Sequence, residues 1–306
     1  MQTQSKTKQL VALYSSATIV VFWFLMFSFR HGFHPPEWLA LTAIMWIPGL
    51  LSILWRLAFK EGFGDVGWRI GKGRYWAWAY VLPLVFGVFA YGLAFLLHRI
   101  TVAPRLSEQK MLEALYFRLH WFVQSASEPT MFAQRFLAVA VIGMVPGFFL
   151  ALGEELGWRG YLLSRLVQTD WQYPLLLSAF IWAVWHLPFL LLTGYGHGAL
   201  SVLLHTILIL LFGVFIGWLR LASGSVWVAA MAHASFNGFV QSFLGLSFVG
   251  DHYWIWVGDY GILILVPYGF LVAWLYQTRR VRAAVRLHRR TMRMPPNTPQ
   301  TVAAAL

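Results

Sequence analysis

The sequence has 306 residues, of which 59% are hydrophobic and only 11% are charged, whereas ordinary soluble domains carry about 25% charged residues. The absence of cysteine excludes disulfides, thiolate zinc sites and a cysteine nucleophile. The formal net charge is +12, but seven arginines crowd behind the last apolar stretch, so we expect anionic lipid at a cytoplasmic tail and no nucleic-acid partner.

Eight apolar stretches are long enough to cross a bilayer, which takes about 20 residues per helix. In chain order they are residues 10–29, 38–59, 76–97, 131–152, 173–193, 200–221, 226–244 and 254–276. No small-residue cleavage site follows the first stretch, which we therefore interpret as a retained span rather than a signal peptide. The sequence predicts an all-α, polytopic membrane bundle of about eight helices over residues 1–277, with a basic, disordered tail over residues 278–306.

An even number of spans places both termini on one side, and most Lys and Arg residues fall on that side. Both termini are therefore expected in the cytoplasm, with the chain in the cell (inner) membrane. The outer segment 98–130 then carries apolar residues at near-helical spacing from Met111 to Val123, which is typical of an amphipathic surface helix or a lid.

Two adjacent carboxylates, Glu154 and Glu155, close the fourth apolar stretch, and charges near lipid indicate a function. On a continuing helix their side chains would point about 100° apart. Arg159 follows Glu155 by four residues, so its guanidinium can neutralise and hold that carboxylate. Glu154 is then free to act as a base, although both acids could also be headgroup-level ion-pair partners.

The fifth and seventh stretches carry the other candidate groups. Trp182 and His186 share a helix face, and Pro188 removes a backbone hydrogen bond close to the imidazole, which makes His186 a candidate base or ligand. His233 and Asn237 share a face lined by small residues, and as a pair of donors they suit oxyanion stabilisation. Either set could instead serve helix packing.

Counted from the cytoplasmic ends of their spans, all three clusters can converge toward the cytoplasmic leaflet. Two further polar residues, His205 in the sixth span and Asp259 near the start of the eighth, are interpreted as structural. The spacing of Gly213 and Gly217 indicates a helix contact.

Three short segments resemble the motifs EExxxR, FxxxH and HxxxN of the CPBP family of intramembrane proteases, which contains type II CAAX prenyl proteases and bacteriocin-processing relatives. The matching segments are GluGluLeuGlyTrpArg at 154–159, TrpAlaValTrpHis at 182–186 and HisAlaSerPheAsn at 233–237. The resemblance covers about residues 151–239. Trp182 stands where the motif has Phe, a departure that touches substrate fit more than catalysis.

The resemblance implies an intramembrane endopeptidase with a defined division of roles. Glu154 would activate water with help from His186, His233 and Asn237 would hold the oxyanion, and Glu155, Arg159 and Trp182 would support the site. The substrate would be a membrane-associated peptide or protein, with or without a lipid. A carrier, or an immunity or scaffold protein using the same polar site for binding, is the alternative from another class.

The resemblance leaves the metal question open, because members of the family have been described both as metalloproteases and as glutamate proteases. Glu154, His186 and His233 match the ligands of catalytic zinc in type, but the sequence has no HExxH pair. A divalent metal such as Zn²⁺ is therefore one expectation, and a metal-free site is the other.

Overall fold

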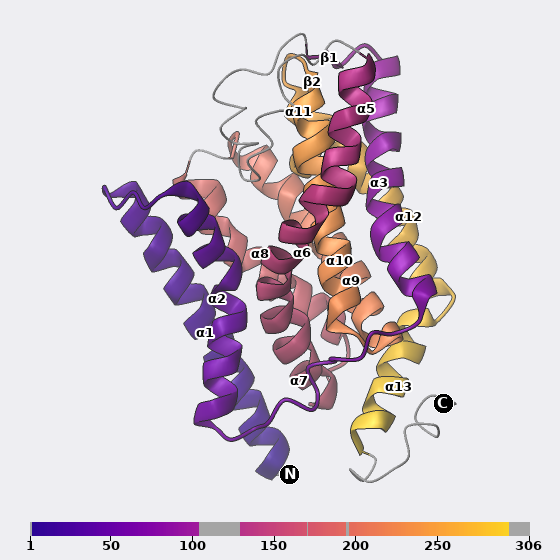
Figure 1. Cartoon of the computed structure of the whole chain (residues 1–306). Helices are drawn as coiled ribbons and strands as arrows, with labels where there is room; N and C mark the ends of the chain where they lie inside the picture. Colours follow the sequence, from indigo (N-terminus) through magenta and orange to yellow (C-terminus); the bar gives the residue numbers. More distant parts are fainter. Residues whose placement is uncertain (1, 104–128, 170, 194–195, 294–306) are drawn as a thin grey trace.

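The computed structural model describes residues 2–103, 129–169, 171–193 and 196–293, and this part of the chain is almost entirely helical (Figure 1). The predicted all-α polytopic bundle is confirmed. The helical segments are α1 (Gln2–Arg30), α2 (Glu37–Ala58), α3 (Gly73–Leu96), α5 (Pro129–Leu137), η3 (Ala138–Gly143), α6 (Met144–Glu155), η4 (Leu156–Leu162), α7 (Leu163–Gln168), α8 (Pro174–Leu192), α9 (Ala199–Ser223), α10 (Val226–Ser235), η5 (Phe236–Leu244), α11 (Gly245–Ser247), η6 (Tyr253–Ile255), η7 (Gly258–Tyr260), α12 (Ile262–Gln277) and α13 (Arg280–Arg293).

Within the described residues, six helices are long and apolar enough to span a membrane, or seven if α12 and α13, which meet at 61°, count as one span. The predicted number of eight spans is therefore slightly higher than the number of described helices that meet this test of length and apolar composition. The predicted seventh span is helical throughout but is divided into α10 and η5, and α11 continues it beyond residue 244. The predicted eighth starts later than expected, because residues 253–260 form the 3-10 turns η6 and η7, with left-handed backbone at Gly258 (φ +78°).

The predicted disordered tail is wrong in its first half, where α13 packs against α7 and α9. Its sequence places apolar residues and a histidine at intervals of three and four, so one face of the helix can be buried. That buried face consists of Val281, Ala284, Val285 and His288. Arg289 fixes the helix by donating to the carbonyl of Val167 (2.9 Å). Residues 294–306 and the predicted outer helix at 111–123 lie outside the described residues.

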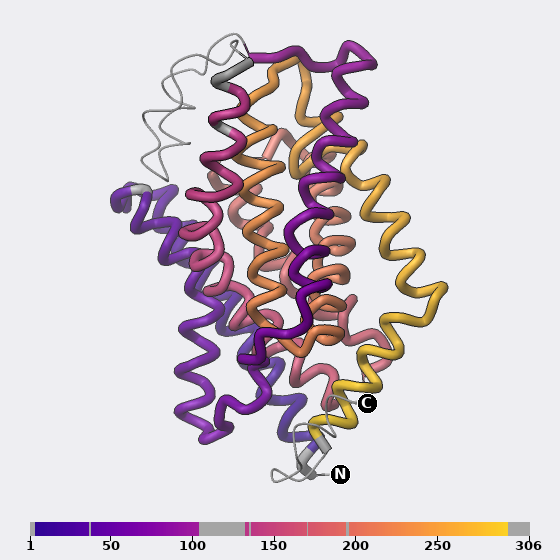
Figure 2. Tube along the Cα trace, turned by 45° about the vertical axis from the view of Figure 1, so that its right-hand side comes forward, coloured from indigo at the N-terminus to yellow at the C-terminus, as the bar shows by residue number. Residues whose placement is uncertain are grey.

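A two-stranded clip lies at the end of the bundle away from the start of α1 and from α13, as Figures 1 and 2 both show. There β1 (Thr101–Val102) pairs antiparallel with β2 (Phe248–Val249), which ties the segment after α3 to the segment after α11. The opposite end carries the start of α1 together with α13 (Figure 1).

Close approach of helices around the middle of the bundle depends on glycines. A Cβ at Gly153 would lie 2.7 Å from the carbonyl oxygen of Met45, so α6 can touch the backbone of α2. A Cβ at Gly213 would lie 2.7 Å from the Cβ of Ala179, so α9 lies directly on α8. The helix contact expected at Gly213 is therefore present, and it brings together two helices that carry polar residues of the site described below.

Replacing Gly213 by Ala should lower the free energy of unfolding by about 1–3 kcal/mol, because the added methyl overpacks the contact with Ala179. SDS titration in mixed micelles would measure the change. Gly92→Ala in α3 is the matched control, since a Cβ there meets nothing within 4 Å. Equal stability of the two variants would show that α8 and α9 can move apart without cost.

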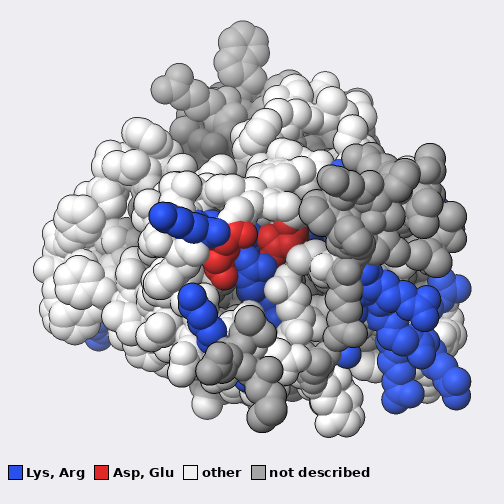
Figure 3. Space-filling view, turned by 90° about the horizontal axis from the view of Figure 1, so that it is seen from below, with Lys and Arg blue, Asp and Glu red and all other residues white. Residues whose placement is uncertain are grey.

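The end of the bundle that carries α13 is held by a buried ionic network. Asp65, in the loop between α2 and α3, accepts hydrogen bonds from Arg56 at Oδ1 (2.6 Å) and from Arg165 at Oδ2. Its backbone carbonyl accepts from Arg220 (2.7 Å). Arg56 also donates to the carbonyl of Gly160 in η4 (3.0 Å). Seen from this end, acidic side chains lie in the centre of the face with Lys and Arg around them (Figure 3).

Candidate active site

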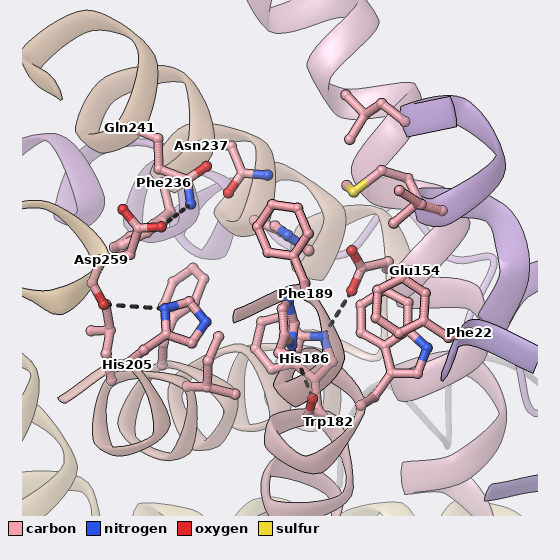
Figure 4. A pocket seen from close by; sticks show the side chains of 18 residues that line it. Phe22, Glu154, Trp182, His186, Phe189, His205, Phe236, Asn237, Gln241 and Asp259 are labelled. Atoms are coloured by element: carbon pink, nitrogen blue, oxygen red, sulfur yellow. Dashed lines mark hydrogen bonds between the residues drawn. The ribbon is translucent and has the colours of Figure 1, made fainter. Parts of the chain in front are cut away.

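A pocket of about 190 Å³ lies among α1, α2, α6, α8, α9, α10, η5 and η7. The structure brings the four predicted catalytic residues to its walls, namely Glu154, His186, His233 and Asn237. Figure 4 shows Glu154 at one side of the pocket and His186 beside the middle of it. The remaining walls are mainly aromatic and aliphatic, so the polar groups face one another in apolar surroundings.

Glu155 lies behind the pocket and joins three segments of the chain. Its Oε1 accepts a hydrogen bond from Arg159 Nη1 (2.9 Å), the pair expected from their four-residue spacing, and a second from His233 Nδ1 (2.9 Å). All three residues are buried. The carboxylate therefore fixes the imidazole of α10 to the helix that carries Glu154, which the sequence had not indicated.

Glu154 is held by two tryptophans. Its Oε2 accepts a hydrogen bond from Trp158 Nε1 (3.1 Å) and a shorter one from Trp182 Nε1 (2.7 Å). Because both indole donors bind Oε2, the other oxygen of Glu154, Oε1, remains available to accept a proton or hydrogen bond from a group in the pocket. Sequence reasoning related Trp182 to substrate fit and not to Glu154, although a buried indole N–H needs an acceptor and this need was the available signal.

Trp182 is central to the arrangement. Its ring centroid lies 5.2 Å from that of His186 and 5.4 Å from that of His233, in edge-to-face geometry with both. The guanidinium carbon of Arg159 lies 4.2 Å from its ring centroid, within the range of a cation–π contact. One indole thus contacts residues from all three motifs.

The hydrogen-bond partners fix how the two histidines can act. His186 Nδ1 lies 2.9 Å from the carbonyl oxygen of Trp182, and because a carbonyl only accepts, this nitrogen carries the proton. In a neutral ring Nε2 of His186 is then an acceptor. His233 Nδ1 donates to the Glu155 carboxylate, so Nε2 of His233 is an acceptor in the neutral ring and a donor only in the imidazolium form.

Two residues interpreted as structural also line the pocket. His205 Nδ1 lies 3.2 Å from the carbonyl oxygen of Asp259, and the His205 ring centroid is 5.5 Å from that of His186. Gln241 Nε2 donates to Asp259 Oδ2 (3.0 Å). His205 of α9 therefore has a hydrogen-bond partner in η7. These residues give the pocket a second polar region opposite Glu154 (Figure 4).

Replacing Trp182 by Phe, the residue of the family motif, should lower the free energy of unfolding by about 1.5–3 kcal/mol through loss of the hydrogen bond to the carboxylate. Trp185→Phe is the control, because Trp185 is equally buried in the same helix and its indole nitrogen has no partner among the described residues. Chemical unfolding in detergent micelles measures both. Equal losses would mean that the hydrogen bond to Glu154 adds nothing to stability.

Residues 135–239 match the family model described as type II CAAX prenyl endopeptidase Rce1-like. This segment is an Rce1-like domain. The match confirms the resemblance to the CPBP family of intramembrane proteases, and it starts upstream of the expected core, within α5. No curated protein gives a significant match to the chain.

The Rce1-like domain contains the three motifs and extends from α5 into η5. The pocket draws on segments beyond it, because α1 contributes Phe22, α2 contributes Met45, and Gln241 and Asp259 follow the matched segment. The chain is thus a multi-pass membrane protein that contains an Rce1-like domain, and helices outside this domain complete the walls of the pocket.

Proposed function

We propose that the protein is an endopeptidase that hydrolyses a peptide bond of a membrane-associated peptide or protein inside this pocket. The observation that carries the proposal is a buried carboxylate, Glu154, held by two indole donors beside two histidines and an asparagine in one cavity. The Rce1-like domain supports the same class of reaction.

Glu154 acts as the general base in the proposed reaction. Its carboxylate takes a proton from a water molecule, and the hydroxide adds to the carbonyl carbon of the scissile bond. The C–N bond then breaks, and the departing nitrogen takes the proton from the glutamic acid. His186 orients the water through Nε2, which is an acceptor because Nδ1 donates to the carbonyl of Trp182.

Asn237 and His233 stabilise the oxyanion of the tetrahedral intermediate. The Asn237 amide offers N–H donors in any protonation state. His233 offers one from Nε2 in its imidazolium form, while its Nδ1 donates to the Glu155 carboxylate. Glu155 and Arg159 are positioning residues in this reaction. Arg159 pairs with Glu155, and Glu155 holds His233 against the helix that carries Glu154.

The side chains do not fit a metal centre as they stand. Among the described residues, no group of three or more His, Asp or Glu side chains is arranged to hold a metal ion. The Nδ1 atoms of His186 and His233 face oxygen acceptors, as those of metal-ligating histidines also do, so it is the placement of the side chains that does not suit a metal ion. No step of the proposed reaction is routed through a metal.

The proposed setting is the cell membrane, with both termini in the cytoplasm. The start of α1 and the whole of α13 lie at one end of the bundle (Figure 1). On α13 the arginines that face away from the buried side are exposed, which suits contact with anionic lipid headgroups. These are Arg280, Arg282, Arg286 and Arg290.

The experiment that tests the proposal compares membrane and secreted peptide termini between cells producing the wild-type protein and cells producing Glu154→Gln. New termini that depend on Glu154 would support hydrolysis. Identical termini under conditions that induce the protein would favour a carrier or scaffold role, and solute flux that survives the substitution would identify a carrier.

A further inference from the structure

An apolar groove lies on the outer surface of the bundle, between α3 and α12, which run side by side (Figures 1 and 2). Its volume is about 570 Å³. The residues that line this outer groove are Val85, Phe86 and Phe89 from α3 and Val266, Pro267, Phe270, Leu271 and Trp274 from α12. Because α3 is a candidate span and α12 is the apolar part of another, the outer groove opens toward lipid.

The side chains of the outer groove suit a flexible hydrocarbon chain better than another helix. Helices in membranes pack closely through small residues such as Gly, Ala and Ser. The walls of the outer groove are built from large side chains instead, and Phe89 and Phe270 remain 45% and 75% exposed. Along α12 the groove extends about 12 Å from Val266 to Trp274, at a rise of about 1.5 Å per residue. These dimensions fit an extended acyl chain.

One end of the outer groove lies beside a cluster of aromatic rings. The ring of Trp274 stacks on that of Trp78 in α3, with centroids 5.9 Å apart. Trp78 contacts Trp218 of α9 (5.5 Å), which also contacts Tyr75 at the start of α3 (5.9 Å). Trp and Tyr gather in this way where a membrane meets water. The outer groove therefore runs from headgroup level at Trp274 into the hydrocarbon region.

A guanidinium group is held at this end of the outer groove. Helices α12 and α13 meet there at 61°, and the guanidinium carbon of Arg280 lies 4.5 Å from the centroid of the Trp274 ring. This cation–π contact positions the exposed Arg280 side chain without using its N–H donors, which suit a phosphate. The three described helices α3, α12 and α13 contain no Asp or Glu, so an anion here meets no acid from these helices.

We propose that the outer groove binds one anionic phospholipid, with an acyl chain between α3 and α12 and the phosphate at Arg280. This inference goes beyond the headgroup contacts proposed for the arginines of α13, because it assigns a place to the chain as well as to the charge. A second copy of the protein is a poorer occupant, since its own arginines would meet those of α13 at the same depth.

Native mass spectrometry of the full-length protein in detergent tests the site with two lipids that share the same acyl chains. Phosphatidylglycerol should bind about 10-fold more tightly than phosphatidylcholine, a difference of about 1.4 kcal/mol. Glycerol phosphate, which lacks the acyl chains, should bind far more weakly than either lipid, because burial of the chain methylenes contributes to affinity. Phosphatidylglycerol with a photoreactive diazirine on one chain should crosslink to peptides that contain residues 85–89 or 266–274.

Arg280→Gln tests the place of the headgroup. It should bring the ratio of the two Kd values toward one, because the charge at the end of the outer groove is lost. Arg286→Gln is the matched control, since it makes the same change at another exposed arginine of α13, and it should leave most of the preference in place. Equal effects of the two substitutions would show a general attraction to a basic helix and would overturn the proposed site.

Val266→Trp tests the place of the chain. Val266 lines the outer groove and is 41% exposed, so a larger ring should occupy the groove, weaken the binding of both lipids and remove the crosslinks. Val88→Trp is the control on α3, at a residue that is 54% exposed and does not line the groove. Phe270→Ala removes part of the wall and should also weaken binding, and it decides the matter if Val266→Trp does not fold.

Unchanged lipid binding in the two groove variants would overturn the inference, as would crosslinks between two copies of the protein through the outer groove in place of crosslinks to lipid. These measurements involve no cleavage of a peptide. Failure of the lipid site would therefore leave the proposed endopeptidase standing, and absence of Glu154-dependent cleavage would leave the lipid site standing.

Discussion

Purified Glu154→Gln protein should hydrolyse a susceptible peptide about 100- to 10,000-fold more slowly than the wild type, the usual contribution of a general base. The amide cannot take a proton from water. Its carbonyl oxygen can still accept the two indole hydrogen bonds that Glu154 Oε2 accepts now, so the local packing should survive. The initial rate of cleavage in nanodiscs measures the effect, and the melting temperature should stay close to that of the wild type.

Glu155→Gln is the matched control, since it makes the same change at the neighbouring residue. Glu155 Oε1 accepts from both Arg159 and His233, so its loss of charge leaves a buried guanidinium without a counter-ion and should lower the melting temperature. A slow, fully stable Glu154→Gln protein beside an unstable Glu155→Gln protein is the expected contrast. A Glu154→Gln protein that retains the wild-type rate would remove Glu154 from the role of base.

Replacing Asp65 by Asn should lower the free energy of unfolding by about 3–5 kcal/mol, the typical cost of removing one partner from a buried ion pair. Asp65 pairs with Arg56 and Arg165, and its carboxylate is only 5% exposed. An amide of the same shape cannot balance two buried guanidinium groups. Chemical unfolding in micelles measures the loss, with Asp251→Asn as the exposed control.

The same substitution should also reduce activity, because Arg56 links Asp65 to the carbonyl of Gly160 in η4, close to Glu155 and Arg159. The rate should recover in conditions that restabilise the fold, such as high osmolyte concentration. Unchanged stability of Asp65→Asn would mean that water and other acids already neutralise the arginines of this network.

Sequence reasoning succeeded where the interaction is local along one helix. The pair of Glu155 and Arg159 follows from four-residue spacing, and the bundle follows from apolar stretches of spanning length. The meeting of the three motifs in one pocket follows from their depth in the fourth, fifth and seventh predicted spans together with the resemblance. These inferences need no knowledge of how each helix is rotated about its axis.

Sequence reasoning failed where the rotation of a helix about its axis, or an irregular backbone, determines which side chains meet. The contact of His205 with Asp259 depends on two 3-10 turns in a stretch that is apolar enough to pass for helix. The hydrogen bond from Trp182 to Glu154 depends on which way a large ring faces. The helix α13 was missed because its arginines dominated the composition, although Val281 and Val285 already marked an apolar face.

The π-helical segments η4 and η5 have a consequence for comparing this chain with its relatives. Such segments form i→i+5 hydrogen bonds and so accommodate an extra residue relative to an α-helix. Glu155 directly precedes η4, and Asn237 lies inside η5. Losing one residue from either would restore α-helical winding and leave the residues downstream on the same faces of their helices, whereas a deletion from a regular α-helix turns them by about 100°. Single-residue alignment gaps between relatives should therefore be placed within these two segments, and a relative that is one residue shorter there should keep its following side chains turned toward the cavity.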